Sequence, residues 1–252
     1  MENHPRVYKQ IPNLLTLMNL CCGFLSIAFV FYRNLETAAL FIIVAAVFDF
    51  LDGFAARMLN ATSEKGKVLD SLSDVVSFGV APAAIIFLII EYSLVRSNSG
   101  FDLDSSSFTD LLFLFSPLIF LIASAWRLAE FTVQKNSSVF NGMPTPAATL
   151  FFAGLALIIS DPGENRISGL LLELYILIPA VLLISYLMIS RIRFISFKFR
   201  DPGFYHNIIQ YILIIFSILL LILFKKFAIS LIIVTYILVS VIHHILIKPS
   251  DL

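Results

Sequence analysis

Four aspartates in two closely spaced pairs are the residues of this sequence best suited to chemistry. Asp49 and Asp52 are three residues apart, and Asp70 and Asp74 are four apart. On a helix, either spacing places both carboxylates on one face. A helical hairpin can bring the two faces together, and the negative charges would then repel one another unless a divalent cation neutralised them. Carboxylate oxygens suit magnesium, manganese or calcium rather than zinc, so the spacing predicts a site for a hard divalent cation.

Small residues and one arginine are interleaved with the aspartates. Gly53 and Ala56 leave a shallow groove where a nucleotide or phosphate can approach the helix, and Gly66 permits a turn or a close backbone contact. Arg57 can bind a phosphate through two parallel hydrogen bonds. A single aspartate at a helix end is usually solvated or a cap, and Asp70 could simply favour the N-terminal dipole of its helix. That explanation does not cover four aspartates at this spacing, so we interpret the segment as a metal and phosphate site.

The elements that must position these residues are helices in a membrane. Of the 252 residues, 59% are hydrophobic and 13% are charged, whereas a soluble domain carries about 25% charged residues. Long apolar runs alternate with short polar connectors, and about 20 apolar residues cross a bilayer as a helix. We therefore expect an all-α fold, a polytopic transmembrane helix bundle of about eight spans. The expected spans are 11–32, 36–60, 69–92, 109–132, 146–160, 168–190, 207–224 and 227–247.

The chain is expected to divide into two parts. Residues 1–190 should form a six-helix catalytic core, and residues 191–252 an interfacial segment with a C-terminal helical hairpin. The hairpin consists almost entirely of Ile, Leu, Val and Phe, which indicates a structural role. Basic residues among phenylalanines in 191–205 are typical of contact with anionic head groups. His243 and His244 lack acidic or cysteine neighbours in the sequence, so we interpret them as an interfacial pair rather than a metal site.

Basic residues indicate the orientation, because they favour the cytoplasmic side of a membrane. With the N-terminus in the cytoplasm, twelve of the 17 lysines and arginines fall on that side and five on the other. We therefore expect a multi-pass protein of the inner cell membrane with both termini and the aspartates at the cytoplasmic face. Lys225 and Lys226 fall on the outer side, so the last hairpin is the least defined part of this topology. The formal net charge of zero gives no indication of a nucleic-acid partner.

Residues 49–74 resemble the signature of the CDP-alcohol phosphotransferases, D-x-x-D-G-x-x-A-R, eight residues, then G-x-x-x-D-x-x-x-D. Every fixed position of the signature is present in this chain. The resemblance implies a membrane enzyme that transfers a phosphatidyl group from a CDP-linked lipid to an alcohol and releases CMP. It also implies a homodimer. The matching residues are Asp49, Asp52, Gly53, Ala56, Arg57, Gly66, Asp70 and Asp74.

The same resemblance implies a role for each of these residues. Asp49, Asp52 and Asp70 would bind Mg²⁺ or Mn²⁺, with two ions expected, and Asp74 would complete the metal site. Asp74 would also be the general base that deprotonates the acceptor hydroxyl. Metal ions suit this chemistry because they neutralise the diphosphate and the charge that develops on CMP. The CDP part of the lipid would be bound by Asp49, Asp52, Gly53, Ala56, Arg57, Gly66 and Asp70.

The flanks of the signature resemble the integral-membrane phosphatidylserine synthases within this family. The similar stretches are 12–26, 71–83, 127–129 and 140–148. They imply CDP-diacylglycerol and L-serine as substrates, and phosphatidylserine and CMP as products of phospholipid biosynthesis. Glu130 departs from the pattern, because a second basic residue is expected at its position. The acid removes a possible binding group for a carboxylate or a phosphate.

Other polar residues stand in the apolar runs beside the signature. Asn13, Thr16 and Asn19 recur every three residues, so they form a polar stripe that either lines the substrate pocket or bonds to other helices. Arg127, near the inner end of a span, either binds the carboxylate of serine or a lipid phosphate, or extends to the interface. Thr145 belongs with these candidates for contact with the acceptor or the lipid.

Two alternatives to a serine transferase stay open at this point. The first keeps the reaction but uses glycerol 3-phosphate or an inositol phosphate as acceptor, and these would need extra basic residues beside the site. Arg127 and Lys135 are few basic residues for binding a phosphorylated acceptor, which favours serine. The second is a divalent-cation transporter, which predicts carboxylates near the middle of the bilayer and a polar path on both sides. The aspartates are instead expected near one face of the membrane.

Overall fold

The regular structure of this chain is helical, as expected. A computed structural model describes residues 10–97, 101–102, 106–133, 142–161, 165–195 and 208–246. Lys135, Phe140 and most of the basic segment 191–205 lie outside the described residues. The elements are α2 (Ile11–Phe31), α3 (Leu35–Met58), α4 (Glu64–Asp74), η1 (Val75–Val80), α5 (Ala81–Ser97), α6 (Phe108–Phe115), α7 (Pro117–Val133), α8 (Thr145–Ile159), α9 (Asn165–Leu171), α10 (Leu174–Ile189), α11 (Ile208–Phe224), η3 (Lys225–Phe227) and α12 (Ala228–Leu246).

Several helices are long and apolar enough to cross a bilayer. In the described part of the chain, five helical stretches meet both conditions, and they are Ile11–Phe31, Leu35–Met58, Glu64–Ser97, Phe108–Thr132 and Ile208–Leu246. Two shorter apolar helices, α8 and α10, pack among them. The prediction of a multi-pass, all-α membrane protein is therefore confirmed, while eight as the number of complete spans stays a prediction.

Three of the expected spans differ clearly from the helices of the structure, and one of them, 109–132, is divided into α6 and α7 at Ser116. The expected span 69–92 begins earlier and ends later, because α4, η1 and α5 continue into one another from Glu64 to Ser97. The middle section, Val75–Val80, is a π-helix. The expected span 168–190 is two helices, since α9 ends at Leu171 and α10 begins at Leu174, after Glu173 as N-cap.

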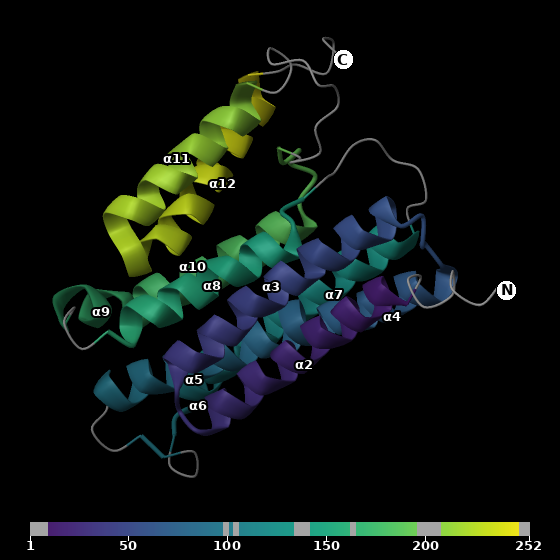
Figure 1. The fold of residues 1–252 in the computed structure, drawn as a ribbon. Coiled ribbons are helices and arrows are strands. Elements are labelled where there is room, and N and C mark those ends of the chain that lie inside the picture. Colours follow the sequence, from purple (N-terminus) through teal and green to yellow (C-terminus); the bar gives the residue numbers. More distant parts are fainter. Residues whose placement is uncertain are drawn as a thin grey trace, which may run out of the picture.

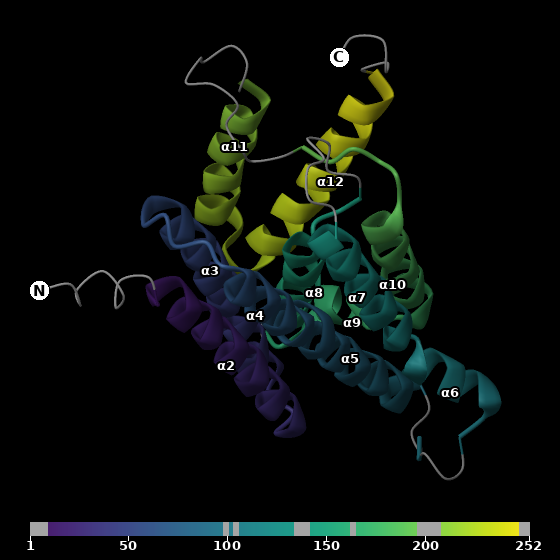
Figure 2. The same ribbon diagram turned by 90° about the vertical axis from the view of Figure 1, so that its right-hand side faces the viewer.

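The bundle is organised around a hairpin and a buried central pair of helices. α2 and α3 run antiparallel and make the most extensive contact between any two elements. α5 and α8 form the centre of the core, where Ile85, Ile89, Phe152 and Ala156 are completely or almost completely buried. α4 lies against α2, and α11 and α12 stand at the side of the bundle, as Figures 1 and 2 show.

The turn between α3 and α4 determines where the two aspartate pairs meet. α3 ends at Met58, and Asn60 takes the left-handed conformation (φ 47°), which asparagine adopts more readily than most residues. Ser63 then caps α4 by accepting a hydrogen bond from the backbone N–H of Gly66. Because this connection is short, the chain turns back at once, and Asp70 and Asp74 near the end of α4 lie opposite Asp49 of α3.

Candidate active site

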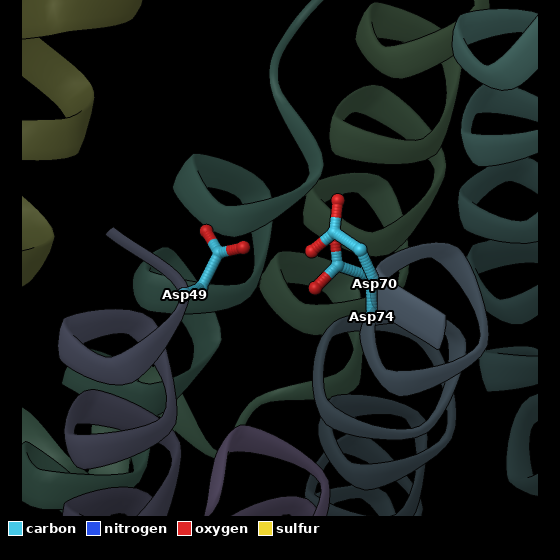
Figure 3. Close-up of side chains that lie close together, drawn as sticks. All are labelled: Asp49, Asp70 and Asp74. Carbon is cyan, nitrogen blue, oxygen red and sulfur yellow. The ribbon is translucent and has the colours of Figure 1, made fainter. Parts of the chain in front are cut away.

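Three of the four predicted aspartates come together between α3 and α4. Asp49, Asp70 and Asp74 each offer a carboxylate oxygen, and these oxygens lie within 4.8 Å of one another. Figure 3 shows Asp49 on one helix and Asp70 and Asp74 on the facing helix. The spacing within α4 and the short α3–α4 turn produce this arrangement. The structure thus places the three carboxylates where one hard cation can contact all of them.

Asp52 does not belong to this group of three. It is buried, with 6% of its surface exposed, and its Oδ2 accepts a 2.6 Å hydrogen bond from Thr16 Oγ1. Thr16 belongs to α2, so this bond ties the end of α3 to the neighbouring helix. Asp52 lines a small cavity together with Asp70, so it remains beside the cluster rather than within it.

The polar stripe on α2 contacts the aspartates directly. Asn19 Nδ2 donates a 3.1 Å hydrogen bond to Asp74 Oδ1, as Thr16 does to Asp52. The backbone of the stripe is held by α4 and η1, since Ser73 Oγ donates to the carbonyl of Thr16 and Ser77 Oγ to that of Asn19. These contacts therefore fit both interpretations of the stripe, as a lining of the pocket and as hydrogen bonding between helices.

Buried oxygens without hydrogen-bond partners are a second reason to expect a divalent cation at the cluster. Three buried side-chain oxygens of the described residues have no hydrogen-bond partner; one is Ser26 Oγ, and the other two, Asp70 Oδ1 and Asn19 Oδ1, belong to the aspartates or to a residue bonded to them. A buried oxygen without a partner is costly, and a carboxylate more so. A cation would satisfy these oxygens and remove the repulsion within the cluster. Asp49, Asp70 and Asp74 are therefore residues that could bind a divalent metal ion.

A cavity of about 100 Å³ opens beside the cluster, between α2, α3 and α4. A Cβ built on Gly53 would meet nothing within 4 Å, so this glycine faces open space. A Cβ on Gly66 would lie 3.0 Å from Asn13 Oδ1, so α2 and α4 approach closely there. Arg57, in contrast, is exposed and does not line the cavity. The lining residues include the predicted Asn13, Thr16, Asp52, Gly53, Ala56, Gly66 and Asp70.

We predict that Gly53→Ala weakens binding of the CDP-linked lipid that the sequence resemblance implies, without weakening the fold. The new methyl group enters open space, so it creates no clash within the protein, and alanine favours a helix over glycine. It does narrow the space beside Asp52 that a ligand would use. We expect KM for the CDP-linked lipid to rise at least fivefold, and the apparent unfolding temperature to stay equal or rise. An unchanged KM would show that the ligand does not approach Gly53.

A larger hollow of about 690 Å³ lies at the other end of the bundle. Its lining includes Arg33, Tyr92 and Arg96. Asn19 of α2, which bonds to Asp74, is 14 residues before Arg33, so roughly 20 Å separates this hollow from the aspartates. The Arg33 guanidinium forms a 2.6 Å ion pair with Glu91, which raises the pKa of Arg33. The aspartates therefore line the smaller of these two hollows.

Arg127 is buried at the depth of Asp74. α7 runs antiparallel to α4 and η1, because Ser71 Oγ lies 2.9 Å from Thr132 Oγ1 and a side chain on Gly79 would touch Ser124. Arg127 stands midway between these two contacts. Its side chain is only 8% exposed, and its Nε is a buried nitrogen without a hydrogen-bond partner among the described residues.

The remaining predicted residues are Glu130 of α7 and Thr145 of α8. Glu130, one turn further along α7, is exposed and interacts electrostatically with Arg127. Thr145 is the first residue of α8 and is buried.

The fold and the aspartate site define a family of membrane enzymes. A family model described as CDP-alcohol phosphatidyltransferase matches residues 9–188. The chain therefore belongs to the CDP-alcohol phosphatidyltransferase family, the membrane transferases of phospholipid biosynthesis. The match includes all four aspartates and ends before the C-terminal hairpin.

Several curated relatives carry a more specific name. The chain is 35% identical over 189 residues to the CDP-diacylglycerol–serine O-phosphatidyltransferase of Bacillus subtilis (strain 168), an alignment that covers 75% of this chain and 91% of the relative. It is 34% identical over 164 residues to the protein of the same name from Methanocaldococcus jannaschii, with 65% and 69% covered. A third, from Helicobacter pylori (strain 26695), is 30% identical over 190 residues, with 74% and 72% covered.

Proposed function

We propose that this enzyme transfers the phosphatidyl group of CDP-diacylglycerol to the hydroxyl of L-serine, giving phosphatidylserine and CMP. The reaction is supported by the cluster of Asp49, Asp70 and Asp74 beside the glycine-lined cavity, within a chain of this family. The acceptor is supported by the relatives named above, which are serine O-phosphatidyltransferases. The single observation that carries the proposal is the convergence of these three carboxylates.

We assign the cation and the donor to different side chains of the site. Asp49, Asp70 and Asp74 would hold a divalent cation, Mg²⁺ or Mn²⁺, and Asp52 could help to hold a second. A bound cation would neutralise the diphosphate and the charge on departing CMP. The cavity beside Gly53 would receive a part of the CDP group, since the whole group is larger than this space.

Asp74 is the proposed general base. The serine oxygen attacks the β-phosphorus, the bond from this phosphorus to the oxygen of CMP breaks, and the proton of the hydroxyl passes to Asp74. The hydrogen bond from Asn19 Nδ2 to Asp74 Oδ1 fixes the orientation of this carboxylate and leaves its other oxygen to accept a proton. Asn19 is thus a positioning residue for the base.

Arg127 is the proposed contact for the acceptor. A buried guanidinium needs an anionic or polar partner, and its Nε has none among the described residues. The carboxylate of serine would supply two oxygens to a planar guanidinium. Glycerol 3-phosphate and inositol phosphate carry a doubly charged phosphate instead, and exposed Glu130 beside Arg127 disfavours them.

A panel of acceptors tests this proposal. The purified enzyme is given CDP-diacylglycerol, Mg²⁺ or Mn²⁺, and one alcohol at a time, and CMP release is measured. We expect release with L-serine to exceed release with glycerol 3-phosphate, inositol 1-phosphate or ethanolamine at least 100-fold, because these lack the carboxylate or add charge. Faster turnover of a phosphorylated alcohol would overturn the choice of serine, and no CMP release with any alcohol would overturn the reaction itself.

The orientation and the assembly are part of the same proposal. We propose that the aspartates and both termini face the cytoplasm, because cytoplasmic loops carry most of the basic residues. This side supplies soluble serine and receives CMP.

We also propose a homodimer, and a division of the chain into a catalytic core of residues 1–190 and a C-terminal part of residues 191–252. A cation transporter is disfavoured, because the cluster lies beside a cavity that a ligand can enter.

A further inference from the structure

Two buried serines of α4 and η1 bond to the backbone of α2, which lies along α4 in Figure 1. Ser73 Oγ donates a 2.9 Å hydrogen bond to the carbonyl of Thr16. Ser77 Oγ donates one of 3.0 Å to the carbonyl of Asn19. A serine in a helix often donates instead within its own helix, as Ser185 does to the carbonyl four residues earlier. Hydrogen bonds that cross between two helices limit how far one helix can slide along the other.

The same two residues of α2 hold aspartates of the site through their side chains. Thr16 Oγ1 donates to Asp52 Oδ2 over 2.6 Å. Asn19 Nδ2 donates to Asp74 Oδ1 over 3.1 Å. A slip of α2 by one residue would move it about 1.5 Å along its axis, enough to break all four of these hydrogen bonds. Each serine is therefore linked to one carboxylate through one residue of α2.

Two neighbouring helices fix the backbone around Ser77. A Cβ built on Gly23 of α2 would collide with Ser77 Oγ and lie 2.8 Å from its Cα, so α2 and η1 approach each other closely. From α8, Thr149 Oγ1 donates a 2.9 Å hydrogen bond to the carbonyl of Phe78. η1 is a π-helix, and single π-turns between α-helical turns are frequent at functional sites. Ser77 therefore has one defined position against α2.

We propose that Ser73 and Ser77 are positioning residues that set the register of α2 at the active site. Ser73 acts through Thr16 on Asp52, beside the cavity for the donor. Ser77 acts through Asn19 on the general base. This inference rests on the proposed function, which assigns the roles of the two aspartates. The family signature does not indicate it, because Ser73 occupies one of its variable positions and Ser77 lies beyond it.

Ser73→Ala and Ser77→Ala in the full-length enzyme should change different kinetic constants. Each variant loses one hydroxyl and its hydrogen bond to α2. At saturating Mn²⁺ we expect Ser77→Ala to lower kcat about fivefold, and Ser73→Ala to raise KM for CDP-diacylglycerol about fivefold, the effect of one lost hydrogen bond. The other constant of each variant should change less than twofold. Ser185→Ala, a buried serine that bonds within α10, is the matched control and should change neither.

Double-mutant cycles separate positioning from general support of the fold. Ser77→Ala should have no further effect on kcat in an Asn19→Ala background, but its full effect in a Thr16→Val background. Ser73→Ala should show the opposite dependence for the KM of CDP-diacylglycerol. Coupling of either serine to both backgrounds, or to neither, would overturn the proposal. Ser77→Cys, which has a similar size and a weaker donor, replaces Ser77→Ala if that variant does not fold.

Mn²⁺ binding gives a measurement that needs no turnover. Each purified variant is titrated with Mn²⁺ without substrates, and free Mn²⁺ is followed by electron paramagnetic resonance. Because Asp74 belongs to the carboxylate cluster, Ser77→Ala should weaken Mn²⁺ binding about threefold, and Ser185→Ala should not. The acceptor in the kinetic assays is whichever alcohol the wild type converts fastest. No CMP release by the wild type would contradict the proposed function, whereas unchanged Mn²⁺ binding in Ser77→Ala would contradict the positioning role alone.

Discussion

Asp74→Asn should lower kcat at least about 1000-fold while the protein stays folded. Asparagine has nearly the same shape and can still bond with Asn19, but it cannot take the proton of the acceptor hydroxyl. It also removes one charge from the three carboxylates that lie within 4.8 Å. Loss of a general base alone costs about 100- to 10,000-fold, and the weakened cation site adds to this. The measurement is CMP release under saturating CDP-diacylglycerol and acceptor.

The matched control is Asp102→Asn, an exposed aspartate between α5 and α6. It has the same chemical change far from the cluster, so kcat should stay within twofold of the wild type. The two roles of Asp74 can be separated by raising the Mn²⁺ concentration, since excess metal restores a weakened site but not a missing base. Full recovery of Asp74→Asn at high Mn²⁺ would contradict the role of base and leave only that of ligand.

The aspartate cluster was predictable because helical spacing determines it. Separations of three and four residues place each pair on one face, and the short turn through Asn60 and Ser63 brings those faces together. The position of Asp52 was not predictable from spacing. Whether its carboxylate joins the other three depends on a competing partner, and Thr16 Oγ1, 36 residues earlier, supplies one.

The parts that the sequence did not reveal depend on contacts between distant segments. Val75–Val80 has no glycine or proline before Gly79 that would indicate a π-helix, but its wider turn directly follows Asp74 and places Ser77 against α2. The hydrogen bond from Tyr236 Oη to the carbonyl of Ile195 joins residues 41 positions apart. Hydrophobic periodicity describes one helix at a time, so it predicts helices well and their partners poorly.

Removal of divalent cations should abolish activity and lower thermal stability together. Without a cation, the carboxylates of Asp49, Asp70 and Asp74 repel one another, and Asp70 Oδ1 has no hydrogen-bond partner. Two unit charges about 5 Å apart repel by roughly 3 kcal/mol in a partly shielded site, and by less where water reaches them. We expect EDTA to reduce CMP release at least about 100-fold. Excess Mg²⁺ or Mn²⁺ should restore it.

Asp70→Asn shows whether the same cluster causes both effects. The variant has one negative charge fewer, so in EDTA its apparent unfolding temperature should exceed that of the wild type by about 3 °C, since 1 kcal/mol corresponds to roughly 2–4 °C in a chain of this size. In Mn²⁺ the order should reverse, because the wild type gains a bound cation and the variant loses a ligand. Thermal unfolding in detergent, with and without Mn²⁺, measures both, and Asp102→Asn should follow the wild type. A Mn²⁺-induced shift that is as large in Asp70→Asn as in the wild type would place the cation elsewhere.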